Sequence, residues 1–452
     1  MDLNRQTIEE KEFLLKNGSN IAVVGGGPSG SFFAYFALTL AKKCGLNISI
    51  DIFEAKDFNC LGPNGCNHCG GIVSESLIQM LAAEGIILPT DVIRSSIESY
   101  TLHLEQGKTV IQAPYDEQKI VSVFRGLGPS GCQIDHQKSF DQHLLELCAA
   151  KGANIIYERV IGLERKREGI VIKTKDHFAK MYDLVIGAGG LNQNTFELFH
   201  ELCPSFVVPK TTRTHICEIH LGKKLIDEYL GNSMHVFLLN LPNIKFGALI
   251  PKGNYVTMVL LGKNINRNIV DHFLNSEPVK KCFPEKTNQN SVITCSCYPY
   301  INIKGSKLAY SDRVVLIGDS SSSKLYKNGI GAAFITAKAA ANTVIFHGLS
   351  KIHFRKYFEP ICKNLDRDNK IGRFIFGVTS IIQKSSVLKR AMLRMVVREQ
   401  ESKKNNRDAS SILWDTFTGG APYKDILLRF LNPKIVISLL YNILREISNK
   451  QQ

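Results

Sequence analysis

The sequence predicts an α/β (α+β) fold built around a parallel sheet, on two observations from opposite ends of the chain. Near residue 25 a glycine-rich turn joins an apolar strand to a helix, and near residue 320 a second one does the same. A strand, a short glycine turn and a helix in that order form the repeating unit of a parallel sheet. We therefore expect one nucleotide site made from both ends of the sequence.

The first turn has the spacing of a dinucleotide-binding motif. Residues 20–24 are apolar and β-branched, as in a buried strand, and residues 31–42 form an apolar helical stretch without a breaker. Between them lie Gly25, Gly27, Pro28, Ser29 and Gly30, which include the G-x-G-x-x-G pattern. The glycines permit the tight turn, the approach of a pyrophosphate and close helix packing, and the helix N-terminus favours the phosphate charge.

An acidic residue follows at the distance this motif requires. A second strand, residues 48–53, ends at Glu54, which lies 24 residues after Gly30. A carboxylate at the tip of the second strand is expected to accept a hydrogen bond from a ribose hydroxyl. The first motif alone leaves NAD and FAD open.

The second turn favours FAD. The strand of residues 314–317 ends in Gly318 and Asp319, and Gly329 and Gly331 open a helix of small residues, 332–341. This arrangement resembles the second FAD motif of the hydroxylase-type flavoproteins. Ser320 replaces the usual Ala and Tyr326 replaces the usual Pro. The resemblance implies that Asp319 accepts from the ribityl chain and that Gly329 and Gly331 direct amides at flavin or phosphate.

A third segment departs from that family in one position. Residues 182–190 resemble its internal strand and turn, but Gly189 stands where the second Asp is usual. In the hydroxylases that Asp accompanies nicotinamide use, so its absence weakens the expectation of direct reduction by NADPH.

Composition sets the class of protein. The 452 residues are 44% hydrophobic and 21% charged, as in ordinary globular proteins. The polar first 18 residues do not read as a signal peptide, no apolar run reaches about 18 residues, and 12 cysteines indicate free thiols in a reducing compartment. We expect a cytoplasmic protein.

The basic charge is concentrated at the C-terminal end. Of a net charge of +15, residues 351–452 carry +11, from 20 Lys and Arg against 9 Asp and Glu. Basic residues flank two apolar stretches there, 374–382 and 435–444. Such helices either bind the cytoplasmic face of an anionic membrane or pack on the catalytic part with a solvated face outward. Without aromatic platforms or a known binding motif, nucleic acid is not expected as a partner.

A cysteine-rich loop, residues 60–74, contains Cys69-Gly70-Gly71. This loop resembles the FAD-dependent geranylgeranyl reductase family, in which a Cys-Gly segment lies beside the flavin. Phe246, Ile250 and Pro251, in a Phe-Gly-Ala-Leu-Ile-Pro-Lys-Gly segment, resemble that family's prenyl-pocket strand. The resemblance covers roughly residues 18–350. It implies that Cys69 works at the flavin, and Arg125 is a weaker candidate for contact with phosphate or flavin.

The same cysteines allow two other interpretations. Cys60, Cys66 and Cys69, with His68, could hold zinc or an iron–sulfur cluster, although the spacing fits neither pattern closely. They could also be small residues of a tight turn. No metal is therefore assigned.

These parts predict three regions: a Rossmann-like FAD-binding domain with a parallel sheet, an inserted antiparallel-sheet substrate-binding domain and a helical C-terminal region. We assign residues 1–69, 116–198 and 305–348 to the first and residues 70–115 and 199–304 to the second. The basic helical region takes residues 349–452, with a polar linker at 399–408.

The predicted function is an FAD-dependent oxidoreductase that reduces C=C bonds of a lipid-like, geranylgeranyl-type substrate. The electron donor stays open between NAD(P)H, ferredoxin and another carrier. Three alternatives remain: an aromatic or quinone monooxygenase, a flavin-free prenyl-binding protein, and a flavin–metal electron carrier that uses the cysteine loop.

Overall fold

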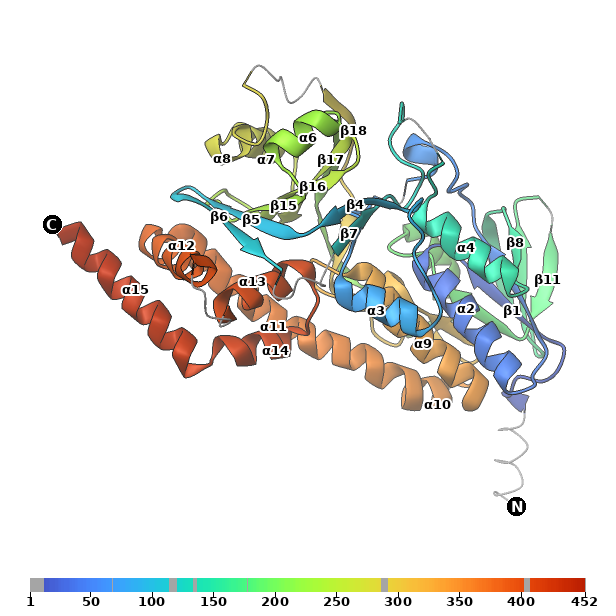
Figure 1. Ribbon diagram of the computed structural model, residues 1–452. Coiled ribbons are helices and arrows are strands. Elements are labelled where there is room, and N and C mark those ends of the chain that lie inside the picture. Colours follow the sequence, from blue (N-terminus) through green and yellow to red (C-terminus); the bar gives the residue numbers. More distant parts are fainter. Residues whose placement is uncertain are drawn as a thin grey trace. The chain divides into compact units, whose positions relative to one another are not determined.

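The computed structural model describes residues 12–66, 68–113, 120–132, 136–176, 178–285, 292–401 and 407–451 (Figure 1). Asn67 of the cysteine loop and residues 402–406 of the predicted linker lie outside these ranges. The chain divides into two compact units. The first unit comprises residues 1–60, 138–211 and 302–367, and the second comprises 61–137, 212–301 and 368–452.

The first unit is built on the predicted parallel sheet. Its order is β20-β21-β12-β1-β2-β8, and only the edge strand β20 runs antiparallel to its neighbour. The strands are β1 (Ser19–Val24), β2 (Ile48–Phe53), β8 (Asn154–Ile156), β12 (Leu184–Gly187), β20 (Tyr310–Ser311) and β21 (Val314–Leu316). The sheet draws on all three segments of the unit, so the chain returns to its first strand after nearly three hundred residues.

Two helices of this unit pack side by side. They are α2 (Pro28–Lys43) and α9 (Gly329–Phe346), which follow the two glycine turns. Phe334 meets Phe32 and Phe36 edge-on, with ring centroids 5.5 and 5.1 Å apart. Among the described residues, α9 is the single unbroken helix long and apolar enough to cross a membrane, but 61% of it is buried in the protein. It serves as a core helix.

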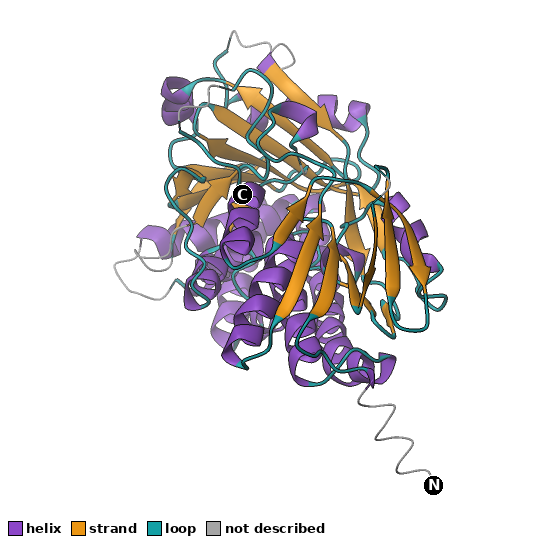
Figure 2. Ribbon diagram, turned by 90° about the vertical axis from the view of Figure 1, so that its right-hand side faces the viewer, coloured by secondary structure: helices purple, strands orange, loops and turns teal. Residues whose placement is uncertain are grey.

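The remaining elements of the first unit surround this sheet. Figure 2 looks onto the side where β8 and β11 lie in Figure 1 and shows the strands as a layer with helices behind. The remaining elements of this unit are β9 (Val160–Arg165), β10 (Ile170–Thr174), β11 (Ala179–Tyr182), α4 (Phe140–Ala150), α5 (Gln193–His200), the 3-10 helix η3 (Gly318–Ser320), α10 (Lys351–His353) and the π-helical turn η4 (Phe354–Phe358). Helix α11 (Glu359–Lys384) begins here and ends in the second unit.

The second unit contains a seven-stranded, mostly antiparallel sheet in the order β18-β14-β17-β16-β15-β5-β6. Its strands are β5 (Ser99–Leu104), β6 (Gly107–Gln112), β14 (His215–His220), β15 (Ser233–Phe237), β16 (Ile244–Lys252), β17 (Tyr255–Gly262) and β18 (Ile293–Cys297). A small sheet joins β3 (Ile72–Val73), β7 (Ile120–Val123) and β4 (Ile93–Ile97). A further pair, β13 (Lys210–Arg213) and β19 (Tyr300–Lys304), spans the unit boundaries.

Helices complete the second unit. They are α3 (Glu75–Ala83), α6 (Lys223–Tyr229), α7 (Arg267–Leu274), α8 (Glu277–Lys280), α12 (Ser386–Glu401), α13 (Asp408–Thr418), α14 (Tyr423–Phe430) and α15 (Pro433–Gln451), with a 3-10 turn η1 (Gly62–Asn64). Trp414 of α13 is fully buried against Tyr100 of β5 and donates to Glu75 of α3. The C-terminal helices therefore share a core with the sheet.

The boundaries of the units differ from the predicted ones. Residues 199–211 and 302–304, predicted for the substrate-binding domain, group with the first unit. Residues 61–69 and 116–137 group with the second unit, because β7 pairs with β3 and β4 there. The C-terminal region does not form a third compact body: residues 349–367 group with the first unit and 368–452 with the second. Buried apolar side chains such as Trp414 pack the C-terminal helices against the sheet. A count of charged residues does not reveal this packing.

Candidate functional site

The first glycine turn is shaped by two positions that exclude a side chain. Gly25 has a φ of +111°, and a Cβ on it would lie 2.6 Å from the Ala188 carbonyl oxygen. A Cβ on Gly30 would lie 1.9 Å from the Gly25 carbonyl oxygen. Helix α2 starts after Gly27 at Pro28 without a side-chain cap. Its first amides therefore point outward in the manner that suits a phosphate.

Glu54 fastens this turn to the second strand. One carboxylate oxygen accepts from the Gly26 N–H at 2.7 Å, and the other accepts from the Lys56 N–H at 2.9 Å. Burial raises the pKa of Glu54 above its ordinary value, and the backbone bonds oppose that rise. Since a carboxylate has about four lone-pair sites, it can also accept from a ribose hydroxyl.

The two glycine motifs meet in space. Gly318 has a φ of +63°, and a Cβ placed on it would lie 2.7 Å from Cβ of Ser29 in the first motif. Its N–H donates to Thr336 Oγ1 of α9 at 2.9 Å, and the next residue, Asp319, accepts through its carbonyl from Asn302 at 3.2 Å. The sequence pattern did not single out Thr336 or Asn302, because such a hydroxyl or amide has no fixed spacing from the motif.

The two glycines at the start of α9, Gly329 and Gly331, have different roles. A Cβ on Gly329 would lie 3.9 Å from Asp319 Oδ1, an ordinary contact, so this position borders the Asp319 carboxylate. The Gly331 N–H instead donates to Asn328 Oδ1 at 2.9 Å. Asn328, at a φ of 55°, caps the helix. The Gly331 amide thus stabilises the start of the helix. The sequence analysis had predicted that this amide contacts flavin or phosphate.

Gly189 has a steric reason for being glycine. A Cβ there would lie 2.4 Å from Thr195 Oγ1 and 2.8 Å from Thr195 Cβ in α5. The Asp that the hydroxylases carry at this place could not be added without moving α5. The presence of Gly instead of Asp at position 189 is therefore explained by close packing against Thr195 in the first unit.

In the second unit, the cysteine loop lies against the predicted pocket strand β16. A Cβ on Gly70 would lie 3.2 Å from Val259 and 3.6 Å from Cδ1 of Ile250. A Cβ on Gly71 would lie 1.9 Å from the Val123 carbonyl oxygen and 2.9 Å from Lys252 Nζ. Two segments that are about 180 residues apart in the sequence are therefore packed at van der Waals distance.

The three predicted pocket residues do not share one face of β16. Side chains alternate along a strand, so Ile250 and Lys252 point to the side of the loop and Pro251 points away. The Pro251 carbonyl accepts from Ser122 at 2.8 Å. Phe246 stacks on Phe376 of α11, with ring centroids 6.0 Å apart, which makes it part of the core with the C-terminal helices.

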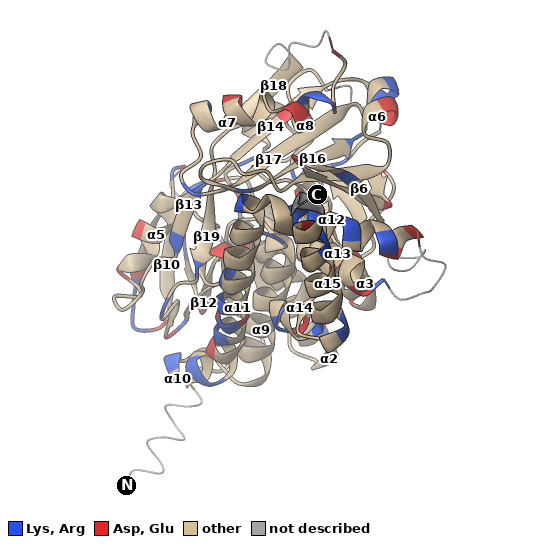
Figure 3. Cartoon of the chain, turned by 90° about the vertical axis from the view of Figure 1, so that its left-hand side faces the viewer, with Lys and Arg blue, Asp and Glu red and all other residues tan. Residues whose placement is uncertain are grey.

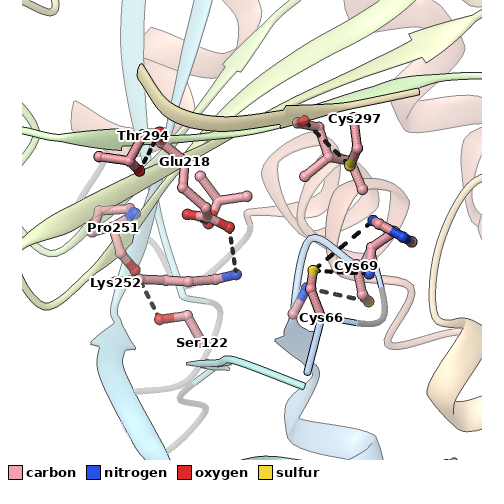
Figure 4. Close-up of polar contacts among 12 residues, drawn as sticks. Cys66, Cys69, Ser122, Glu218, Pro251, Lys252, Thr294 and Cys297 are labelled. Atoms are coloured by element: carbon pink, nitrogen blue, oxygen red, sulfur yellow. Dashed lines mark hydrogen bonds and ion pairs between the residues drawn. The ribbon is translucent and has the colours of Figure 1, made fainter. Parts of the chain in front are cut away.

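Lys252 is the residue that the sequence analysis missed. Its side chain is fully buried, and its ion-pair partner is Glu218 at 3.8 Å (Figure 4). Nζ also lies 4.7 Å from the centre of the Phe124 ring. Within the described part of the chain, Nζ has no hydrogen-bond partner. Such an ammonium retains donors for a bound group.

Glu218 completes this pair. It accepts from Thr257 at 2.7 Å, and burial raises the pKa of its carboxyl, which Lys252 and Thr257 partly offset. The Lys252–Glu218 pair thus places ionisable groups in an apolar wall. The sequence analysis recognised only the apolar strand around this pair. Lys252 gave no signal of its own, because a Lys after a Pro is unremarkable in a strand.

The cysteines near this pair are thiols. Cys69 Sγ accepts from the Gly71 N–H at 3.3 Å. Burial raises the pKa of Cys295 to about 11 and that of Cys297 to about 12, with Glu218 and Cys66 adding to the rise. Cys60 donates to Asp57. The described residues contain no three-residue metal-ligand group that includes Cys60, Cys66 or Cys69.

Arg125 lies half-buried in the bend after β7, in the second unit. It is not part of the glycine turns of the first unit, so its predicted contact with phosphate or flavin stays a prediction.

Comparison with known proteins identifies the fold. No protein-family model and no curated protein matches the chain. Among solved structures, a geranylgeranyl bacteriochlorophyll reductase-like protein from Thermoplasma acidophilum superposes with a TM-score of 0.64 at 16% identity, over 92% of this chain and 99% of that one. PqsL, a probable FAD-dependent monooxygenase from Pseudomonas aeruginosa, gives 0.56 at 11% identity, over 81% and 97%.

CmlS, a flavin-dependent halogenase, gives a TM-score of 0.53 at 15% identity, over 94% of this chain and 72% of that one. The chain therefore has the fold of FAD-dependent flavoproteins, as the glycine motifs predicted. That fold serves reductases, monooxygenases and halogenases alike, so it does not identify the reaction.

Proposed function

We propose that this protein is an FAD-dependent oxidoreductase that reduces C=C bonds of a prenyl, geranylgeranyl-type lipid. The observation that carries the proposal is the packing of the Cys69-Gly70-Gly71 loop on Ile250 and Lys252 of β16. The two segments that resemble the geranylgeranyl reductases are thereby brought together in one unit. The likeness to the reductase-like protein, over almost the whole of both chains, supports the same choice.

The first unit fits the dinucleotide. The α2 amides would hold the pyrophosphate, Glu54 would hold the adenosine ribose, and Asp319 would hold the ribityl chain, while Gly25, Gly30 and Gly318 keep the surface free of side chains. When bound and reduced, FAD would supply the hydride for one carbon of a double bond. The other carbon needs a proton from the protein.

Cys69 is our choice for the proton donor. Transfer of its proton leaves a thiolate, whose free energy a nearby cation lowers. The buried ammonium of Lys252 flanks the same loop, since a Cβ on Gly71 would lie 2.9 Å from Nζ. The apolar side chains of β16 and β17 would exclude water and orient a substrate that offers no polar handle.

The test follows the flavin without oxygen. The purified protein is reduced anaerobically and mixed with a geranylgeranyl lipid, and the visible spectrum is recorded. Reoxidation of the flavin with a saturated product is expected. An unchanged reduced spectrum would overturn lipid reduction. A colourless purified protein that also fails to bind added FAD would overturn the cofactor and favour a prenyl-binding role.

A monooxygenase is the second candidate, because PqsL has the same fold. The steric exclusion of Asp from position 189 weighs against it. Consumption of oxygen and NADPH with an aromatic or quinone substrate would favour it.

We also infer that helix α15 places the enzyme on an anionic membrane that contains the substrate. Its outer face consists of large apolar side chains between 45% and 65% exposed: Ile437, Leu440, Tyr441, Leu444 and Ile447. Its buried side contains two polar side chains, Asn442 and Glu446, besides the apolar Ile435. Glu446 is buried and pairs with Arg390 and Arg394 of α12, and Asn442 accepts from Arg398. A water-facing amphipathic helix has the opposite arrangement.

Charge favours an anionic lipid surface as the partner. From Tyr423 to Ser448 the exposed charged residues are Lys424, Lys434 and Arg445 against Asp425. Figure 3 shows basic positions along α11, α12 and α14 as well. A surface with exposed apolar groups and basic neighbours binds acidic headgroups more tightly than neutral ones.

Vesicle binding tests this surface. The protein should sediment with vesicles that contain phosphatidylglycerol and less with pure phosphatidylcholine. Leu444→Glu should lose this binding by at least about tenfold, and Ile87→Glu, at a site 72% exposed outside these helices, should retain it. Equal binding by both variants, or a stable dimer of the wild type that ignores vesicles, would contradict the membrane role.

A further inference from the structure

A second group of chemically active side chains lies in the core of the second unit. His103, His235 and Cys282 are all buried, with 4%, 4% and 1% of their surfaces exposed. His103 Nε2 lies 3.0 Å from His235 Nδ1, which lies 3.3 Å from Cys282 Sγ, and Sγ lies 3.9 Å from His103 Nε2. Three atoms that bind transition metals thus form a compact triangle in a hydrophobic core.

The sheet register brings the two histidines together. β5 and β15 run parallel, with His103 opposite Phe237 and His235 opposite Thr101. Residues two apart on a strand point to the same face, so both imidazoles lie on one side of the sheet. Cys282 follows α8 and belongs to the hydrophobic cluster on that side, with Phe237 and Val279. Three separate parts of the sequence contribute one side chain each.

Neighbouring groups fix both rings. His235 Nε2 lies 3.2 Å from the Leu230 carbonyl oxygen, which can only accept a hydrogen bond, so Nε2 carries the hydrogen and the Nδ1 lone pair faces the other two residues. His103 is stacked on Phe237 at 4.5 Å between ring centroids. A carbonyl behind a histidine is the usual second contact of a metal ligand, because it orients the ring and fixes the tautomer.

The triangle has the size that a tetrahedral metal requires. Zn–N bonds of about 2.05 Å and a Zn–S bond of about 2.3 Å set the ligand atoms about 3.3 Å apart for N···N and about 3.6 Å for N···S. The observed distances of 3.0, 3.3 and 3.9 Å surround these values. A purely hydrogen-bonded triad is the competing explanation, since the 3.0 Å separation also suits an N–H···N bond.

We propose that His103, His235 and Cys282 bind one closed-shell d10 transition-metal ion, Zn²⁺ or Cu⁺. Both ions accept imidazole and thiolate together. On binding, the Cys282 thiol loses its proton to solvent and its sulfur bonds to the metal, so the site carries a net charge of +1 with Zn²⁺ and zero with Cu⁺. The ion would tie the turn after α8 to β5 and β15.

The two ions differ in what the core tolerates. A net charge in an apolar core is costly. Within the described part of the chain no fourth ligand accompanies the three. Both facts favour Cu⁺, whereas the near-tetrahedral distances favour Zn²⁺, so the experiment has one arm for each.

The full-length protein is freed of metal with a chelator and then loaded with Zn²⁺ in one arm and, without oxygen, with Cu⁺ in the other. After removal of excess ion, the metal bound per chain is measured by mass spectrometry. One ion per chain is expected in at least one arm. Cys282→Ser should retain less than about a tenth of it, and Cys217→Ser should retain it fully. Cys217 is also fully buried in the same cluster, so it controls for loss of a core thiol.

A second measurement needs no variant. Co²⁺ bound to the wild type should give a thiolate-to-cobalt charge-transfer band in the difference spectrum against the metal-free protein. Failure to retain Zn²⁺ or Cu⁺ and to show this band, or equal metal content in both variants, would overturn the proposal in favour of the hydrogen-bonded triad. Metal content is measured independently of flavin and turnover, so this outcome is distinct from failure of the proposed function.

Discussion

Gly30 in the first unit and Gly71 in the second meet the same steric limit for different reasons. At each, an added Cβ would lie 1.9 Å from a carbonyl oxygen. For Gly30 that oxygen belongs to Gly25, five residues earlier in the same turn. For Gly71 it belongs to Val123, on a strand 52 residues later, and the same added Cβ would lie 2.9 Å from Lys252 Nζ. The first constraint is local and the second is tertiary, so only the first is visible as a sequence motif.

The largest effect is expected from Gly30→Ala, which forces one backbone group into another. We expect loss of more than about 3 kcal/mol of stability and of nearly all bound FAD. Flavin absorbance per folded chain and the thermal unfolding midpoint would measure both. Gly377→Ala, at a helical site with no atom within 4 Å of the added Cβ, is the matched control and should retain its flavin and lose no stability. A Gly30→Ala protein with full flavin content would refute our reading of the first motif.

Gly71→Ala should separate the two units functionally. Its Cβ would displace Val123 and Lys252 in the second unit, while the glycine turns of the first remain as they are. We expect the variant to retain FAD and to lose turnover of lipid by at least about a hundredfold, roughly 2.7 kcal/mol in activation free energy. Turnover is measured at equal flavin concentration. If turnover and flavin are lost in equal proportion, the two glycines do not have separate roles.

Lys252→Met tests the buried ion pair through pH. Without the ammonium, the already raised pKa of Glu218 should rise further. For an acid with a raised pKa in the folded state, stability is fully present below the ordinary value of 4.5 and falls as pH rises toward the folded value. The slope in this window is up to about 1.4 kcal/mol per pH unit.

Unfolding midpoints between pH 4.5 and 8 should therefore fall over a wider range of pH in Lys252→Met than in the wild type. The double variant Lys252→Met/Glu218→Gln should remove that extra dependence, since no carboxyl is left to titrate. Identical pH profiles of wild type and Lys252→Met would show that the two groups are not coupled.

The smallest effect is expected from Gly189→Ala, since its Cβ meets a side chain instead of the backbone. A loss of about 1–3 kcal/mol is expected from overpacking against Thr195. Chemical denaturation measures it, and Gly189→Ala/Thr195→Gly should be less destabilised than the sum of its two single changes. Strict additivity of the two changes would place the cost elsewhere.

The parts of the fold that the sequence predicted are those that short-range patterns specify. Strand β2 has the predicted bounds, and Gly25, Gly30 and Gly318 lie in turns that exclude side chains. Asn328 was missed, although an Asn three residues before Gly331 is a recognisable cap signal. The motif was interpreted only through its glycines, as contacts to a ligand.

The second unit could be predicted only in fragments. Lys252, Glu218 and Thr257 come together through the pairing of β14, β16 and β17, and no spacing in the sequence encodes that register. His103, His235 and Cys282 meet in the same way across β5, β15 and α8. Because these contacts depend on tertiary packing, a single sequence shows the residues without their neighbours.

The mass of the lipid after one anaerobic turnover tests the central claim most directly. Reduced protein is mixed with a geranylgeranyl lipid in the absence of oxygen, and the lipid is extracted and analysed by mass spectrometry. The account predicts a lipid that has gained two hydrogen atoms for each flavin reoxidised, in the wild type and not in Gly71→Ala. A lipid of unchanged mass, together with an oxygenated product once air is admitted, would contradict it.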